Sequence, residues 1–374
     1  NIADYVARAI TPKTGLVTNL PGGGGDYEGG IVDWPIAMRY GYDKSSAALT
    51  TVNILGIEVF REVAAAGVAL NRPASEVDDA RARSAALTSA VNARLRNADG
   101  VYIDGLHRDG TKSTHASQQS NAYALAAGIV PSVARPAVVR LVVRLGMAMG
   151  PDVAAVLLAA LHDSGNDQAV IDLVSDAKVP GWAQILARGA TFTWESWNAR
   201  DVPGDSESHA WGSTVLPALT STVLGVQVTE PGARRVAIAP PRTSITSARG
   251  RLATERGPVS VAWHRADARH FTLEVTVPDN VVGTVRLPAL NVRNVRERGH
   301  AVGSVAGVKV EAVGAGTVRV AVGSGRYSFS VGPASRRVNY ARTLLIALAV
   351  FVLLAAAALV IEGRRRSSTF DAAS

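Results

Sequence analysis

A tryptophan-rich stretch at residues 180–211 carries the side chains best suited to chemistry. Four of the chain's six tryptophans lie in it, namely Trp182, Trp194, Trp197 and Trp211. They surround the carboxylate of Glu195 and the imidazole of His209. Indole rings stack on the apolar faces of sugars, and a carboxylate beside them can act as a general acid or base. The stretch therefore favours a carbohydrate site; the alternative is a set of core tryptophans, with Glu195 paired to Arg188 or Arg200.

A second candidate region is the glycine-rich loop at residues 15–45. A phosphate-binding loop is excluded because neither GxxxxGK[ST] nor a strand–GxGxxG–helix pattern occurs there. The glycines are followed by Asp33-Trp34-Pro35 and then by Arg39 and Tyr42, an aromatic and charged cluster just before a helix. This cluster suits sugar binding; the alternative is that Asp33 caps the next helix and Trp34 closes the end of the helical domain.

The order of motifs along the chain resembles a known family. The segment GWAQILARGATFTWESW is followed by SHAWG, by Gly-Val and by RRVAIAP. This series is similar to the end of the catalytic barrel of α-L-rhamnosidases of glycoside hydrolase family 78. The matching residues are Gly181, Trp182, 186–191, Trp194, Glu195, Trp197, 208–212, Gly225, Val226 and 234–240. Weaker resemblance extends from about residue 12 to residue 332.

The resemblance implies hydrolysis of a terminal α-L-rhamnoside with inversion, and Glu195 matches the general base. Asp33 and Trp34 match the segment that lines the sugar subsite, where Trp34 would stack on the ring and Asp33 would bind its hydroxyl groups. His209 would hydrogen-bond the sugar or the attacking water. The other expected substrate-binding residues are Arg39, Trp194, Trp197 and Trp211. The expected partner is thus a rhamnose-containing glycan or glycoside.

An inverting mechanism also needs a general acid, with the two carboxyl groups roughly 6.5–9.5 Å apart. In the family this acid lies in a DxPxRDER-type motif upstream of the Asp-Trp-Pro segment, and the chain has no such string. We therefore expect a fragment, the C-terminal part of a longer enzyme, that lacks the acid. The alternative is that Asp26 or Glu28 replaces it.

Two other functions stay open at this point. One is a different six-hairpin glycosidase, of the glucoamylase or trehalase type. The other is a non-catalytic cell-surface carbohydrate-binding protein.

Hydrophobic periodicity predicts the elements that must position these residues. Helices are expected over 46–66, 74–95, 117–127, 134–146, 151–163 and 167–176. They follow one another in antiparallel pairs with no intervening strands, which is typical of an α-hairpin array. About six helices precede Glu195, whereas a complete (α/α)6 barrel has six pairs. After about residue 240, alternating apolar residues predict a β-sandwich.

The expected fold class is therefore a multidomain α and β chain. It comprises a partial (α/α)6 six-hairpin barrel at 1–235, a β-sandwich at 236–333, a linker at 334–343, a transmembrane helix at 344–361 and a short basic tail at 362–374. The helix is predicted from an uncharged apolar run followed by three arginines. We expect the cell membrane as the location. The catalytic domain is placed outside from the sugar chemistry, because basic residues flank both ends of the run.

Composition excludes other classes of function. Lys and Arg number 39 against 31 Asp and Glu, a net charge of +8, but the basic residues are spread along the chain. Nucleic-acid binding is therefore not expected. The chain has no cysteine, which excludes disulfides and thiol catalysis. We assign no cofactor and no metal ligand.

Overall fold

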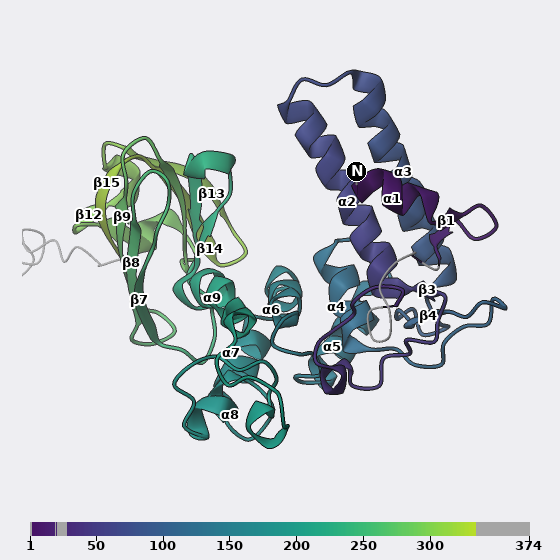
Figure 1. The fold of residues 1–374 in the computed structure, drawn as a ribbon. Helices are drawn as coiled ribbons and strands as arrows, with labels where there is room; N and C mark the ends of the chain where they lie inside the picture. Colours follow the sequence, from purple (N-terminus) through teal and green to yellow (C-terminus); the bar gives the residue numbers. More distant parts are fainter. Residues whose placement is uncertain (1, 19, 21–27, 334–374) are drawn as a thin grey trace, which may run out of the picture.

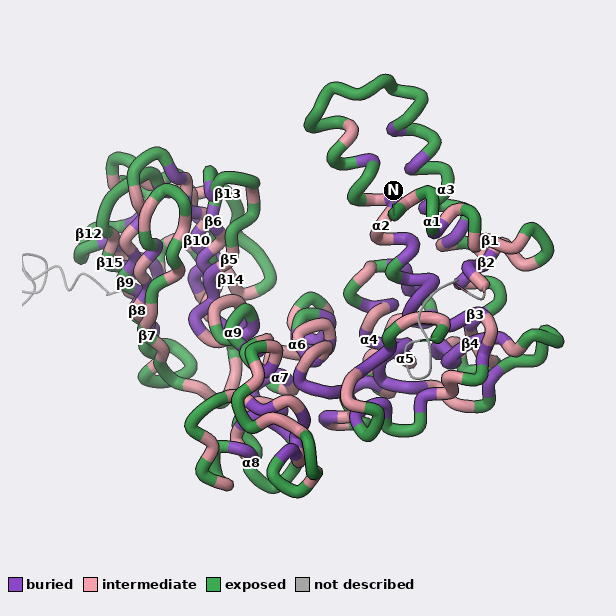
Figure 2. The backbone as a smooth tube through the Cα atoms, in the orientation of Figure 1, coloured by how far each residue is buried: buried purple, intermediate pink, exposed green. Residues whose placement is uncertain are grey.

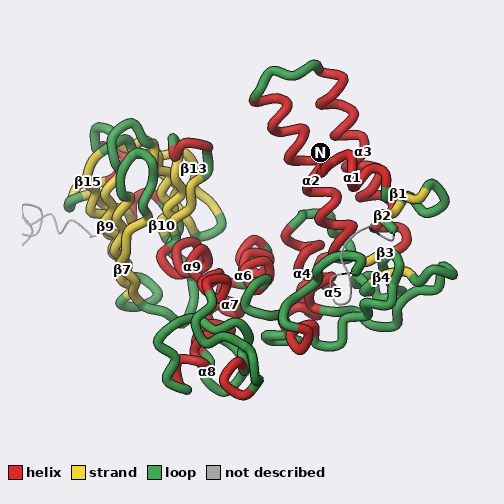
Figure 3. Tube along the Cα trace, in the orientation of Figure 1, coloured by secondary structure: helices red, strands yellow, loops and turns green. Residues whose placement is uncertain are grey.

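The computed structural model describes residues 2–18, 20 and 28–333. A helical region comes first in the chain, and a region of two sheets follows it and lies beside it (Figures 1 and 3). Each region has its own cluster of buried apolar side chains, and the two clusters share no residue. The predicted segment 344–361 lies outside the described residues.

Nine α-helices occur among the described residues. They are α1 (Ile2–Arg8), α2 (Thr50–Ala69), α3 (Ala74–Arg94), α4 (Gln118–Ala126), α5 (Arg135–Arg144), α6 (Ala154–Asp163), α7 (Asp167–Ser175), α8 (Trp182–Ala187) and α9 (Val215–Ala218). The helices predicted from periodicity are all present, with ends shifted by a few residues. Short 3-10 helices, among them η2 (Ile36–Arg39) and η4 (Ala210–Thr214), lie in the long connections.

The longest helices, α2 and α3, form an antiparallel hairpin that rises from the helical region (Figure 1). Ile57 and Phe60 of α2 and Leu87 and Val91 of α3 are buried, because they recur on the face that each helix turns toward its neighbour. Pro73 directly precedes α3, where its missing N–H costs nothing. The far end of the hairpin is largely exposed (Figure 2).

The expectation that no strands separate the helices is wrong. Two small antiparallel pairs lie in the helical region, β1 (Ile10–Thr11) with β2 (Leu16–Val17), and β3 (Ala48–Leu49) with β4 (Gly105–Leu106). A Cβ atom on Gly105 would collide with the backbone carbonyl oxygen of Ala48, so only glycine permits this pairing. Strands of two residues are too short to give an alternating pattern in a sequence.

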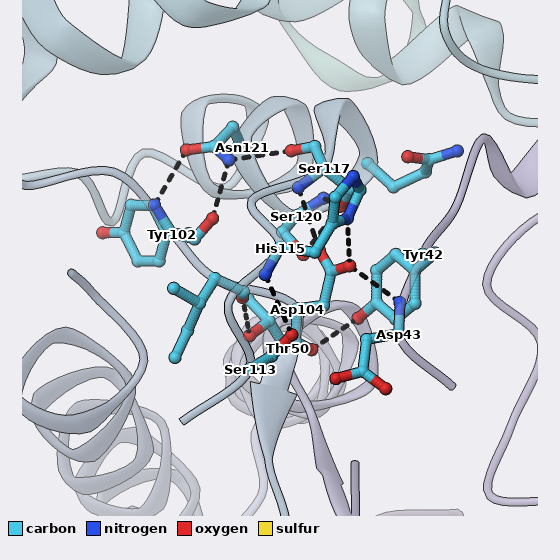
Figure 4. A network of polar contacts seen from close by, with 12 residues as sticks. Tyr42, Asp43, Thr50, Tyr102, Asp104, Ser113, His115, Ser117, Ser120 and Asn121 are labelled. Carbon is cyan, nitrogen blue, oxygen red and sulfur yellow. Dashed lines mark hydrogen bonds and ion pairs between the residues drawn. The ribbon is translucent and has the colours of Figure 1, made fainter. Parts of the chain in front are cut away.

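A buried carboxylate next to β4 holds several loops of the helical region together (Figure 4). The side chain of Asp104 has no exposed surface and accepts hydrogen bonds from the backbone N–H groups of Asp43 (2.8 Å) and Ser117 (2.9 Å). Nδ1 of His115 lies 2.6 Å from the same carboxylate, and the hydroxyl group of Ser120 donates to it at 3.3 Å. One side chain thus joins the loop before α2 to the start of α4.

Eleven strands build the second region. The strands are β5 (Val226–Val228), β6 (Arg235–Ile238), β7 (Ser247–Leu252), β8 (Val259–Arg265), β9 (Phe271–Val277), β10 (Val282–Leu287), β11 (Val295–Glu297), β12 (His300–Ala301), β13 (Val308–Gly314), β14 (Thr317–Val322) and β15 (Gly325–Val331). One sheet has the order β13-β14-β10-β6-β5 and the other β12-β11-β15-β9-β8-β7. All pairings are antiparallel except that of β6 with β10.

Alternation along the strands explains why the two sheets pack together. In β9, Phe271, Leu273 and Val275 are buried and the residues between them are more exposed. Each sheet therefore turns one apolar face to the other and one polar face to solvent. Strand β5 begins ten residues before the expected domain boundary at 235/236, directly after Gly225 ends the helical region in a left-handed conformation (φ 78°).

The expected fold class needs correction. The fold is a mixed α and β one, with a helical region followed by two sandwich-like sheets. The transmembrane helix that was part of the expected class, and the membrane contact inferred from it, find no support. No helix within residues 2–18, 20 and 28–333 is both long and apolar enough to cross a membrane.

Candidate active site

The site centres on a hydrogen bond between two residues that are far apart in the sequence. The indole Nε1 of Trp34 donates to Oε1 of Glu195 at 3.1 Å, across 161 positions. The backbone N–H of Ser206 donates to the other oxygen, Oε2, at 2.8 Å. The carboxylate is therefore fixed from two sides, while 14% of the Glu195 side chain is exposed. A carboxylate that is oriented in this way and still reaches solvent can accept a proton from a bound water.

His209 and Trp211 lie on the same side of the carboxylate. Nδ1 of His209 is 3.6 Å from Oε2 of Glu195, and the His209 ring lies over the Trp211 ring with centroids 4.0 Å apart. The indole Nε1 of Trp211 donates to the backbone oxygen of Glu195 at 3.0 Å. The structure thus brings together four of the predicted site residues, Trp34, Glu195, His209 and Trp211.

The loop after α8 carries Glu195 and folds back on itself. The backbone N–H of His209 donates to Thr193 O and the hydroxyl group of Thr193 donates to His209 O, each at 2.7 Å, and Glu195 N donates to Ser206 O at 2.9 Å. A Cβ atom on Gly212 would lie 2.6 Å from Cβ of Thr193, so the close approach of the two arms needs glycine. These contacts set the direction in which Glu195 points.

A buried tryptophan with two arginines braces the same loop. Trp194 is 1% exposed, and the guanidinium carbons of Arg188 and Arg200 lie 5.4 and 4.9 Å from its ring centroid. Arg188 makes two hydrogen bonds to Asp201 (2.8 and 2.7 Å), and Arg200 is paired with Glu207. Arginine suits this role because it can stack on a ring and bind a carboxylate with two N–H groups.

Trp197 is also a core residue. It is 2% exposed, donates from Nε1 to Met149 O at 2.7 Å, and meets the Trp182 ring edge-on with centroids 4.9 Å apart. Trp194 and Trp197 are therefore core tryptophans, which was the alternative to a carbohydrate site in the sequence analysis. Their predicted contact with substrate stays a prediction that their burial does not favour.

Asp33 is buried and contacts the backbone of Trp34. Its side chain has no exposed surface and accepts hydrogen bonds from the backbone N–H groups of Trp34 (2.9 Å) and Gly150 (3.1 and 2.9 Å) and from Nε2 of Gln119 (2.8 Å). Arg39 is buried too, and its Nε donates to Asp33 O at 3.2 Å. Burial disfavours the predicted contact of Asp33 and Arg39 with sugar. Their contacts fit better with a role in holding the segment that carries Trp34.

A second carboxyl group, that of Asp152, lies against Asp33. Burial raises the pKa of Asp33 to about 9, with a further contribution from the neighbouring Asp152 carboxyl group. Burial also raises the pKa of Asp152. Two carboxyl groups in hydrogen-bond contact need a proton between them, and the raised pKa of both favours that proton. Nothing in the sequence marks Asp152, because an aspartate after Pro151 near a helix start is an ordinary feature.

This proton predicts how stability changes with pH. The native state holds the Asp33 proton up to about pH 9, whereas the unfolded chain loses it near the usual value of 3.8. The stabilisation is therefore complete below about pH 4 and is lost as pH rises toward 9, by at most about 1.4 kcal/mol per pH unit. Asp33→Asn, which stays neutral, is expected to show a smaller fall in unfolding free energy between about pH 5 and pH 8.

Urea unfolding at several pH values measures this difference. The matched control is Asp99→Asn, on an exposed loop, which should keep the parent's pH profile. If the unfolding free energy of Asp33→Asn falls with pH as steeply as that of the parent, Asp33 is ionised in the folded protein.

Of the two residues considered as substitutes for the general acid, the structure describes one. Glu28 is exposed, and its backbone oxygen accepts a hydrogen bond from Lys44 at 2.8 Å. Asp26 lies outside the described residues. Among the described residues, no group of three or more acidic or histidine side chains is arranged to hold a metal ion.

Two family models match the chain. The model of the bacterial alpha-L-rhamnosidase 6 hairpin glycosidase domain matches residues 18–223. The model of the bacterial alpha-L-rhamnosidase C-terminal domain matches residues 225–301. The two matches meet near Gly225, where the helical region gives way to the sheets.

Curated relatives are longer than this chain. It is 30% identical over 176 residues to an alpha-L-rhamnosidase of Streptomyces avermitilis, covering 44% of this chain and 17% of that protein. It is 29% identical over 141 residues to an alpha-L-rhamnosidase of Alteromonas sp. (strain LOR), covering 36% of this chain and 15% of that protein. The matched stretches thus span about a sixth of the length of these relatives.

Solved structures share the fold. The crystal structure of Streptomyces avermitilis alpha-L-rhamnosidase complexed with L-rhamnose matches with a TM-score of 0.68 at 21% identity, covering 88% of this chain and 30% of that one. Native alpha-L-rhamnosidase from Aspergillus terreus matches with a TM-score of 0.67 at 19% identity, covering 87% of this chain and 35% of that one.

Proposed function

Since the chain belongs to the bacterial alpha-L-rhamnosidase family, whose six-hairpin domain model matches residues 18–223, we propose that its site serves the hydrolysis of terminal α-L-rhamnosides. The observation that carries the proposal is the Trp34–Glu195 hydrogen bond. It joins an indole, suited to stacking on a sugar ring, to a carboxylate suited to proton transfer. The name of the Streptomyces avermitilis relative points to the same substrate class.

In this proposal Glu195 is the general base. It takes a proton from a water molecule, which then attacks the anomeric carbon from the face opposite the leaving group, so the configuration inverts. Trp34 and Trp211 offer the half-buried rings of the site, and His209 lies close enough to Glu195 to hydrogen-bond the water or a sugar hydroxyl group. The bonds from Trp34 and Ser206 keep the carboxylate oriented toward that water.

The general acid is proposed to come from a part of the enzyme beyond these 374 residues. The stretch that matches the Streptomyces avermitilis relative covers only 17% of that protein, which leaves ample room for another carboxyl group. Asp33 and Asp152 are poor candidates, because their carboxyl groups are engaged with each other and Asp33 has no exposed surface. Glu28 remains the alternative acid within the described residues.

Hydrolysis of p-nitrophenyl α-L-rhamnopyranoside tests the proposal. We expect turnover by a form of the protein extended toward its N-terminus and none by the 374-residue chain, with β-L-rhamnose as the first product seen by NMR. Turnover by the chain alone would place the acid within it and direct attention to Glu28. If neither form cleaves this substrate but one cleaves an α-glucoside or trehalose, the enzyme is a different six-hairpin glycosidase. Binding of rhamnosides without any turnover would indicate a carbohydrate-binding protein.

A further inference from the structure

The outer face of the six-stranded sheet carries a trough that the proposed function does not use. It is lined by arginines on β7 and at the start of β15 and by small side chains on β8 and β9 between them. We call this surface the arginine trough and define it by Arg249, Arg251, Ser260, Thr276, Arg326 and Ser328. The sheet forms the side of the sandwich that includes β7, β8, β9 and β15 (Figure 1).

The strand register explains the shape of the arginine trough. Arg251 is paired with Ser260, Ser260 with Thr276, and Thr276 with Arg326, so these four residues form one row across four strands. Side chains in such a row all point to the same face of the sheet. At roughly 4.8 Å per strand, the arginines at the two ends of the row stand about 14 Å apart. Two small hydroxyl-bearing residues form the floor between them.

The arginines of the trough are available to a ligand. Arg249, Arg251 and Arg326 are exposed, and within the described ranges no hydrogen bond or ion pair engages their side chains. Some other arginines of the same domain are paired, among them Arg319 with Glu311 at 3.3 Å and Arg235 with Glu230 at 2.8 Å. The three unpaired arginines therefore give the trough a net positive charge, and the fourth arginine that lines it, Arg298, is paired with Glu297 at 3.4 Å.

One carboxylate, Glu274, stands in the adjacent row. It is paired across the strands with Ala262 on one side and Ser328 on the other, and Ala262 in turn with Arg249. A ligand lying across the sheet thus meets positive charge at the edges and hydrogen-bond acceptors and hydroxyl groups in the middle. This pattern suits anionic groups separated by neutral, hydroxyl-bearing units.

We propose that the arginine trough binds an anionic polysaccharide, one whose carboxylate or sulfate groups are spaced along sugar rings. The guanidinium groups of Arg249, Arg251 and Arg326 bind the anionic groups, and the serine and threonine hydroxyl groups of the floor and Glu274 bind sugar hydroxyl groups between them. Single-stranded nucleic acid fits less well. Its recognition relies on stacked aromatic side chains, and Tyr327, the aromatic residue that lines the trough in the described structure, is itself stacked on Phe329 at 6.0 Å.

Binding of fluorescently labelled oligogalacturonate, a carboxylated glycan, and of a sulfated dextran of similar length tests the proposal. We expect the chain to bind at least one of them, more weakly as salt rises, and neutral dextran not to bind. Replacing Arg249, Arg251 and Arg326 together with alanine should weaken this binding about tenfold, which corresponds to the loss of three exposed charge pairs. Which of the two polymers binds more tightly identifies the anionic group.

A matched control separates the arginine trough from net charge. Replacing Arg140, Arg144 and Arg293 with alanine removes the same three charges from exposed positions elsewhere and should change the affinity by less than about twofold. Equal loss in both triple variants would overturn the proposal in favour of non-specific attraction. The proposal also fails if neither polymer binds. It fails too if a DNA oligonucleotide of equal charge binds more tightly than both polymers and loses its affinity when Arg249, Arg251 and Arg326 are replaced. Because the assay measures binding, it is independent of whether the enzyme cleaves rhamnosides.

Discussion

Replacing Glu195 with glutamine is expected to lower kcat for rhamnoside hydrolysis by about 10²- to 10⁴-fold in the active form of the enzyme, the usual range for a lost general base. The amide cannot accept the proton of the attacking water. It also cannot accept both of the N–H groups that now point at the carboxylate, from Trp34 and from Ser206, so one hydrogen bond is lost. Steady-state kinetics with p-nitrophenyl α-L-rhamnopyranoside measures the effect.

Two control variants make this result specific. Glu28→Gln changes the other carboxylate considered for catalysis and should leave kcat within about twofold if Glu28 is an exposed loop residue without a role. Trp34→Phe removes the indole N–H but keeps a ring, and should reduce kcat by less than Glu195→Gln does. A Glu195→Gln enzyme with normal kcat would remove Glu195 from the mechanism.

Replacing Asp104 with alanine is expected to cost about 3–5 kcal/mol of unfolding free energy, the range seen when one partner of a buried polar network is removed. Its side chain is fully buried and receives hydrogen bonds from two backbone N–H groups and from the side chains of His115 and Ser120 (Figure 4). Alanine leaves the buried N–H of Ser117 and the buried hydroxyl group of Ser120 without this acceptor, whereas His115, whose side chain is 43% exposed, can turn to water. Urea unfolding followed by circular dichroism measures the loss.

Asp99→Ala is the control for this second prediction, because Asp99 lies exposed on the nearby loop before β4 and should change stability by less than about 0.5 kcal/mol. Asp104→Asn should fall between the two, since the amide keeps one acceptor but turns a donor toward other donors. If Asp104→Ala unfolds at the parent's urea concentration, the loops are held by their backbone contacts alone.

Helices such as α2 could be predicted because apolar residues recur along them at helical spacing. Ile54 and Phe60 belong to this pattern in α2, and both are buried. The short strands could not be predicted, since their two residues carry no period. The sequence shows a glycine at position 105, but the need for glycine comes from the close approach of the Ala48 backbone, a contact between segments that are distant in the sequence.

The site was predictable in part for a different reason. Glu195 and Trp34 were found through motifs that resemble a family, because no local pattern connects residues separated by 161 positions. Composition could not distinguish Trp211, which flanks the site, from Trp197, which is buried, since both are tryptophans in one stretch. Asp152 was missed because its significance comes only from the buried carboxyl group of Asp33 beside it.

The separate apolar clusters of the two regions have a consequence for heat inactivation. Burial of apolar surface is what makes unfolding cooperative, so two cores without a common residue are expected to melt in two steps. Every contact that orients Glu195 comes from the helical side of Gly225. Loss of the sandwich would therefore leave those contacts in place, and loss of the helical core would abolish them. Calorimetry and residual activity of the active, extended form, recorded on one temperature ramp, would thus identify which region melts first.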